Sequence, residues 1–86
     1  MTSMEQIQPG DFYEDSAYHP CVCVECSIEK DEIWGISLID GSYPRSESLS
    51  LSGIRKLDIG QVWEWKTNGA PELRNDPSFP EEKRWW

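Results

Sequence analysis

Two alternating segments joined by four charged residues constrain this chain more than any other feature. Residues 20–28 read Pro-Cys-Val-Cys-Val-Glu-Cys-Ser-Ile, and residues 33–39 read Ile-Trp-Gly-Ile-Ser-Leu-Ile. Side chains that alternate with a period of two and include many β-branched residues are typical of strands. The charged connection at 29–32 suits a hairpin loop. We therefore expect an antiparallel hairpin, with a bend or bulge at Gly35, because glycine inside a strand often marks one.

The same alternation assigns side chains to faces. Successive side chains of a regular strand point to opposite faces of the sheet, and we expect the apolar residues of the alternating segments to turn toward one core. In the segment 20–28, one face carries Val22, Val24, Cys26 and Ile28, and the other carries Cys21, Cys23 and Glu25.

Three shorter strands complete the β pattern. Residues 11–13 follow a Pro-Gly turn and are read as a first strand. Residues 48–52 read Ser-Leu-Ser-Leu-Ser, which places two leucines inward and three serines toward water. Residues 54–57 follow a glycine and form a last short strand. Five short strands within about fifty residues are typical of a small antiparallel barrel.

A helix is expected at residues 59–67. Asp58 is a favourable N-cap residue, and Gln61 three positions later completes the pattern of a capping box. Asn68 and Gly69 provide a C-terminal stop. The next residue but one is Pro71, which prevents the helix from continuing.

The spacing of apolar residues predicts how this helix faces the core. Ile59, Val62, Trp63 and Lys66 are three, four and seven residues apart and share one helical face. Lys66 falls in the last turn, where the helix dipole favours a cation. We therefore expect Trp63 to point into the core and Trp65 to be partly exposed.

The order of these elements resembles an SH3-like barrel over about residues 9–57. The resemblance is carried by Pro9-Gly10-Asp11-Phe12 and by the acidic loop Glu14-Asp15. It implies a mainly β fold, a small five-stranded antiparallel SH3-like barrel with one short C-terminal helix. An α+β open meander sheet with a packed helix is the alternative. The Ala-Leu-Tyr-Asp-Tyr stretch and the paired tryptophans of signalling SH3 domains are missing, so the resemblance does not imply binding of proline-rich peptides.

The chain has 86 residues, which suits one domain. We expect a single globular domain at 9–69, preceded by a loose arm at 1–8. Residues 70–86 are rich in proline and mixed charge and are read as a tail. The tail ends in two tryptophans, which are costly to leave in water and are expected to pack back on the domain or to bind something.

The charge of the chain excludes several classes of partner. Sixteen acidic and eight basic residues give a net charge of −8. Non-specific nucleic-acid binding and docking on anionic lipid both require clustered Lys and Arg. An acidic surface favours solubility, and it also favours a protein partner with a basic patch. Residues 1–10 lack the features of a secretory signal, and no segment is apolar enough to span a membrane, so a cytoplasmic location is expected.

A metal or thiol site is the alternative function that the sequence suggests. His19, Cys21, Cys23 and Cys26 lie close together, but their spacing inside a strand does not bring four ligands into a tetrahedron. An odd, clustered set of cysteines also does not resemble a secreted disulfide framework. We expect no metal, no cofactor and no catalytic residues, because nucleophilic catalysis requires a base and an orienting group around the thiol.

Aromatic and charged residues near the two longest loops are the candidate partner-binding set. Aromatic residues and Arg are frequent at interface hot spots, and loops of a small barrel lie close together. A neighbouring acidic cluster at Asp11, Glu14 and Asp15 is read as a solvated turn or as a contact for a basic partner. The candidate partner-binding residues are Tyr13, Glu14, Asp15, Tyr18, Tyr43, Arg45 and Trp65.

The sequence therefore favours a protein–protein interaction or inhibitor-type module. An immunity protein, an antitoxin or a phage-encoded modulator would be special cases of such a module. We expect a monomer, or a weak homo-oligomer formed through an exposed strand edge.

Overall fold

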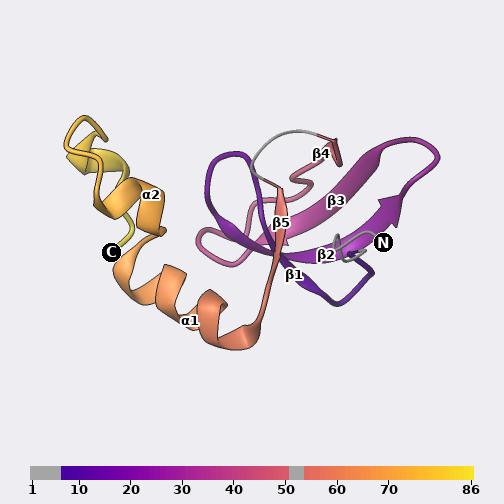
Figure 1. Ribbon diagram of the computed structural model, residues 1–86, viewed down its shortest axis with the longest axis horizontal. Helices are drawn as coiled ribbons and strands as arrows, with labels where there is room; N and C mark the ends of the chain where they lie inside the picture. Colours follow the sequence, from indigo (N-terminus) through magenta and orange to yellow (C-terminus); the bar gives the residue numbers. More distant parts are fainter. Residues whose placement is uncertain (1–6, 51–53) are drawn as a thin grey trace, which may run out of the picture.

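The fold is a curled five-stranded antiparallel sheet with a helical region packed beside it (Figure 1). The computed structural model describes residues 7–50 and 54–86. The sheet has the order β4-β3-β2-β1-β5, and it curls into a half-barrel. The elements are β1 (Phe12–Glu14), β2 (Pro20–Ser27), β3 (Glu32–Ser37), β4 (Glu47–Ser48), β5 (Arg55–Leu57), α1 (Ile59–Asn68), α2 (Pro71–Arg74) and the 3₁₀ helix η1 (Glu81–Lys83).

The strands β1 to β4 form a meander, and β5 returns to pair with β1. The predicted hairpin is confirmed as β2 and β3, which pair antiparallel from Cys21 opposite Ser37 to Ser27 opposite Glu32. β5 lies antiparallel to β1, with Leu57 opposite Phe12. This last pairing brings the end of the β region back beside its start, and β4 and β5 form the two edges of the sheet.

A bulge at Val24 changes the face assignment of β2. The register shifts between Cys23 and Glu25, so Val24 has no partner on β3. A bulge adds one residue and reverses the alternation beyond it. Cys26 consequently packs on the same core as Cys23, and the expectation that it shares a face with Val22 and Val24 is wrong. Ile28, which that alternation also placed on the valine face, is exposed.

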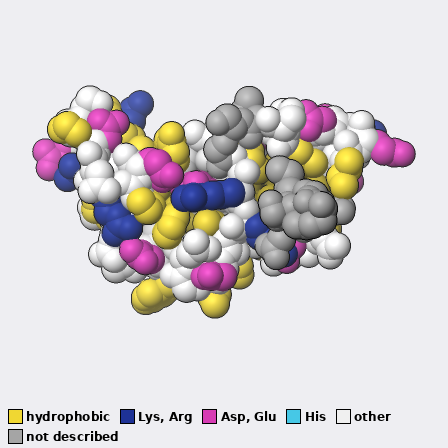
Figure 2. All heavy atoms as spheres, in the orientation of Figure 1, with side chains coloured by type: hydrophobic (Ala, Val, Ile, Leu, Met, Phe, Trp, Pro, Cys, Tyr) yellow, Lys and Arg dark blue, Asp and Glu magenta, His cyan; other side chains and the backbone are white. Residues whose placement is uncertain are grey.

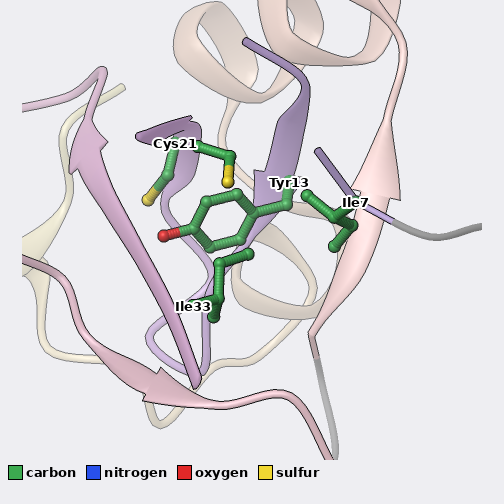
Figure 3. Packing of buried hydrophobic residues seen from close by; sticks show 5 residues of the cluster. Ile7, Tyr13, Cys21 and Ile33 are labelled. Carbon is green, nitrogen blue, oxygen red and sulfur yellow. The ribbon is translucent and has the colours of Figure 1, made fainter. Parts of the chain in front are cut away.

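The core of the sheet is built around the ring of Tyr13 (Figure 3). Tyr13 is fully buried between β2, which contributes Cys21, and β3, which contributes Ile33. Ile7 packs in the same cluster, although the sequence assigns it to a loose arm whose other residues lie mostly outside the described range. Gly35 allows this arrangement, because a Cβ atom there would lie 2.3 Å from the Tyr13 hydroxyl. The predicted irregularity at Gly35 is therefore a close approach, and the bulge lies across from it on β2.

The alternating serine–leucine segment is only partly described. Leu49 is half-buried and packs against the sheet core, as expected. Leu51 lies outside the described residues. Among the described residues of this region, Glu47 and Ser48 form a strand, β4, which begins one residue before the predicted start and is followed by a turn at 49–50.

The start of α1 is confirmed in detail. The backbone N–H of Gln61 donates to the Asp58 carboxylate at 2.7 Å, and the Gln61 side chain accepts from the Asp58 backbone N–H at 2.9 Å. This reciprocal pair is a capping box. Lys66 lies in the last turn, and its ammonium group donates to the carbonyl of Leu38, which attaches the helix to the segment after β3.

The predicted orientation of α1 is wrong. Trp65 is buried, with 5 % of its surface exposed, whereas Trp63 is 71 % exposed. Val62 and Trp65, one turn apart, form the buried face and pack with Leu57. A buried tryptophan needs an acceptor for its indole N–H, and Glu14 of β1 provides one, which helical spacing alone does not reveal.

Residues 70–86 fold against α1. α2 contributes the buried Leu73, and Phe79, Trp85 and Trp86 pack on the cluster that contains Trp65. The C terminus therefore lies next to the helical region, away from the β2–β3 hairpin (Figure 1). Within the described ranges, no helix combines the length and apolar character needed to cross a bilayer.

Candidate functional site

The structure divides the candidate partner-binding residues into buried and exposed groups. Tyr43 is exposed, and Tyr18 and Arg45 are intermediate in exposure. The other four are buried and hold the fold together: Tyr13, Glu14, Asp15 and Trp65.

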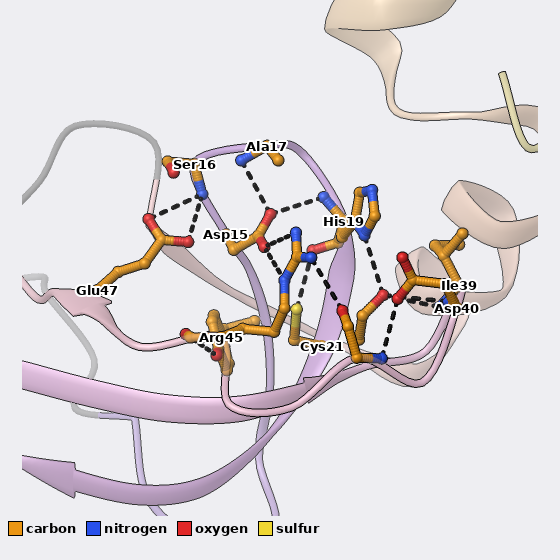
Figure 4. Close-up of polar contacts among 12 residues, drawn as sticks. Asp15, Ser16, Ala17, His19, Cys21, Ile39, Asp40, Arg45 and Glu47 are labelled. Atoms are coloured by element: carbon orange, nitrogen blue, oxygen red, sulfur yellow. Dashed lines mark hydrogen bonds and ion pairs between the residues drawn. The ribbon is translucent and has the colours of Figure 1, made fainter. Parts of the chain in front are cut away.

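Asp15 and Arg45 join the loop after β1 to the loop before β4 (Figure 4). Arg45 donates from Nε and from Nη2 to the same carboxylate oxygen, at 2.9 and 2.6 Å. The other oxygen of Asp15 accepts the backbone N–H groups of Ala17 and His19, each at 2.9 Å. Charge-assisted bonds of this kind are the strong ones. The two loops do lie together, but Asp15 is fully buried and is a brace rather than a contact surface.

Glu14 forms a second buried junction, between the sheet and α1. Its carboxylate accepts the indole N–H of Trp65 at 2.6 Å and Nε of Arg55 at 2.9 Å. Burial raises the pKa of Glu14, and the bonds to Trp65 and Arg55 oppose that rise. The expectation that Glu14 and Asp15 belong to a solvated turn is therefore wrong, because each has a cationic partner distant in the sequence.

The alternative thiol or metal site has little chemical support. Cys21 and Cys23 are buried, and burial raises the pKa of both thiols, that of Cys23 to about 11. The thiol of Cys21 donates to the carbonyl of His19 at 3.5 Å. Protonated thiols are poor nucleophiles and poor metal ligands. Over residues 7–50 and 54–86, no three His, Cys, Asp or Glu side chains converge as a metal ion would require.

Nδ1 of His19 and the hydroxyl oxygen of Ser37 lie 2.9 Å apart, and the surrounding bonds make this a structural contact. The Ser37 hydroxyl oxygen also accepts the backbone N–H groups of Ile39 and Asp40. Burial and the nearby Arg45 cation lower the pKa of His19. Ser37 is buried, so a substrate has no access to its hydroxyl.

An apolar stripe on α1 is the most conspicuous exposed feature. Ile59 and Trp63, one turn apart, are 66 % and 71 % exposed. Figure 2 shows hydrophobic side chains at the lower margin of the molecule, where α1 begins, with acidic side chains beside them. The sequence places both residues on one helical face, but only the structure shows that this face points to solvent. We call Ile59 and Trp63 the α1 stripe.

Trp63 differs from every other tryptophan of the chain. All five tryptophans lie in the described residues, and Trp63 alone is classed as exposed. Single exposed apolar residues are common on protein surfaces, but an indole that is 71 % exposed beside an exposed isoleucine is costly for a free surface.

Charge is distributed unevenly between the two parts of the chain. Residues 7–50 contain nine carboxylates and two basic residues, whereas residues 54–86 contain six of each. The negative charge therefore belongs to the β1–β4 meander, and the helical region that carries the α1 stripe is balanced. A positively charged partner would therefore be attracted mainly to the meander.

Comparison with protein-family models, curated proteins and solved structures yields no match to this chain.

Proposed function

We propose that this protein is a protein-interaction module, built on an SH3-like barrel, that binds a basic protein through the α1 stripe. The observation that carries the proposal is the exposure of Trp63 beside Ile59 on a capped helix. Tryptophan is the residue most enriched among interface hot spots, and it acts by filling an apolar pocket of the partner. The role is binding rather than catalysis, with inhibition of the partner as a special case.

The charge distribution supports a basic partner. The meander has nine carboxylates and two cations, and the sheet stays net negative although Arg55 and Lys56 of β5 pair with two of these carboxylates. A negative field increases the rate of encounter with a positively charged protein, while apolar anchors slow its dissociation. Tyr43, which is 56 % exposed in the segment between β3 and β4, is a second proposed contact.

Site-specific photo-crosslinking tests the proposal. A photoreactive phenylalanine analogue replaces Trp63 in one protein and Ile28 in a control, because Ile28 is also exposed, at 63 %, but lies in the β2–β3 loop. We expect position 63, and not position 28, to yield a crosslinked adduct with one basic protein in extract from the source cells. Excess unlabelled protein should compete for that adduct.

A pair of substitutions completes the test. Trp63→Ser should abolish competition for the adduct, whereas Ile28→Ser should compete like the wild type. Neither change removes a packed side chain, so both proteins should unfold within about 0.5 kcal/mol of the wild type. Equal competition by the two variants would eliminate the α1 stripe as the binding surface.

A further inference from the structure

The last residues of the chain lie against the end of α1. Gly69, the C-cap residue of α1, has φ of +85°, and a Cβ atom there would lie 2.5 Å from the Cδ2 atom of Trp86. The Trp86 ring thus rests directly on the helix terminus. The Phe79 ring stacks on the Trp86 ring, with the two ring centroids 5.8 Å apart. We call Phe79, Trp85 and Trp86 the C-terminal clamp.

Trp85 connects the clamp to both α1 and the sheet. Its indole N–H donates to the backbone carbonyl of Trp65 at 2.9 Å. Its ring meets the imidazole of His19 edge-on, with centroids 4.9 Å apart. His19 directly precedes β2. The Trp85 side chain therefore contacts both α1, through the carbonyl of Trp65, and the residue at the start of β2.

A helix of this length needs such support. α1 has ten residues, and isolated helices shorter than about 12–15 residues are marginal in water. Its polar attachments to the β region include the Trp65–Glu14 bond and the contact of Lys66 with the carbonyl of Leu38, just after β3. The clamp adds aromatic packing on the side of the helix that faces away from Trp63.

We infer that the C-terminal clamp holds α1 in the orientation that buries Trp65 and presents Trp63, so that residues 77–86 control the binding surface. This inference rests on the proposed function, because it concerns the α1 stripe. A protein or protease that engages residues 77–86 would release the clamp and weaken binding at the stripe without touching it. Trp85 and Trp86 are positioning residues in this arrangement.

Two glycines provide a matched test in the full chain. Gly69→Ala places a methyl group into the Trp86 ring, whereas Gly41→Ala also puts an alanine at a positive φ, +75°, but with nothing within 4 Å of the new atom. Hydrogen exchange then reports the local stability of each element. We expect amide exchange in α1 of Gly69→Ala to rise at least tenfold relative to β2 and β3, and the ratio to stay unchanged in Gly41→Ala.

If Gly69→Ala does not fold, Trp85→Phe tests whether the C-terminal clamp supports α1. It retains an aromatic ring against His19 and removes only the indole donor to Trp65. Selective acceleration of exchange in α1, by about threefold or more, supports the clamp. Exchange that is unchanged in α1, or accelerated equally in β2 and β3, overturns it.

Capture of the crosslinking partner separates this inference from the proposed function. Selective loosening of α1 in Gly69→Ala or Trp85→Phe, together with weaker competition for the crosslinked adduct, supports both the clamp and the proposed function. Loosening with undiminished capture retains the clamp as a support for α1 and overturns its control of binding. If Trp63→Ser competes for the crosslinked adduct like the wild type while Gly69→Ala loosens α1, the proposed function fails and the structural role of the clamp stands.

Discussion

The indole N–H of Trp65 and the carboxylate of Glu14 meet at 2.6 Å in the interior, and this bond connects α1 to β1 across 51 positions of sequence. It explains why the helix is rotated so that Trp65 is inside. Arg55 completes the junction, since its guanidinium binds the second oxygen of Glu14 and lies 5.7 Å from the centroid of the Trp65 ring. The exposed position of Trp63 is a consequence of this arrangement.

Replacing Trp65 by Phe should destabilise the protein much more than the same replacement at Trp63. Trp65→Phe retains a ring but leaves one oxygen of the buried Glu14 carboxylate without its donor, which costs about 1–3 kcal/mol. Trp63→Phe changes an exposed side chain and should alter the free energy of unfolding by less than about 0.5 kcal/mol. Urea denaturation, followed by circular dichroism, measures both. Equal midpoints for the two variants would contradict the assigned burial.

Removing the Asp15 carboxylate should be among the most damaging single changes. Asp15→Asn breaks a buried pair with Arg45, and losing one partner of such a pair costs about 3–5 kcal/mol. Glu64→Gln is the control, because Glu64 pairs with Arg74 at 2.9 Å on the surface. Exposed pairs contribute less than about 1 kcal/mol. Denaturation midpoints that fall by the same amount in both variants would show that the brace is not important.

The raised pKa of Glu14 predicts a specific dependence of stability on pH. A carboxyl whose pKa is higher in the folded state than its ordinary value of 4.5 binds its proton more tightly when folded. Its contribution to stability is present below pH 4.5 and is lost as the pH rises through the folded-state pKa. We therefore expect the free energy of unfolding of the wild type, minus that of Glu14→Gln, to fall as the pH rises above 4.5.

Taking this difference removes the groups that are common to both proteins. The pKa of Asp40, for example, is lowered to about 2 by hydrogen bonds from the backbone and hydroxyl of Ser42. Asp40 therefore contributes stability above pH 3.8 that is lost as the pH falls toward 2, in both proteins alike. A difference that is flat, or that rises with pH, would mean that burial does not dominate at Glu14.

The three thiols should react slowly in the folded protein. Burial raises the pKa values of Cys21, Cys23 and Cys26, and the thiolate is the reactive form. With iodoacetamide at pH 8, we expect Cys26, which is half-buried, to be modified first, and Cys21 and Cys23 to be modified rapidly only in denaturant. Peptide mass spectrometry identifies each site. Rapid modification of Cys21 by iodoacetamide in the folded protein would contradict this prediction and favour a thiol-dependent function.

Local patterns were sufficient for most of the elements. The alternation in 20–28 and 33–39 predicts β2 and β3, and the Asp58–Gln61 pair predicts the start of α1 to the residue. These signals are reliable because each depends on backbone geometry and on neighbours within a few positions. The bulge at Val24 was not predicted, since it depends on how β2 fits its partner strand.

What the sequence determines by itself is therefore the set of strands, the capped helix and the acidic charge of the meander. Only the tertiary structure decides that Trp65 is inside and Trp63 outside, that Glu14 and Asp15 are buried, and that the C-terminal tryptophans pack on α1. The physical reason is that the partners of these side chains lie from 20 to 51 positions away. A helical or strand period gives the faces of an element, but the partner that meets a face determines which one is buried.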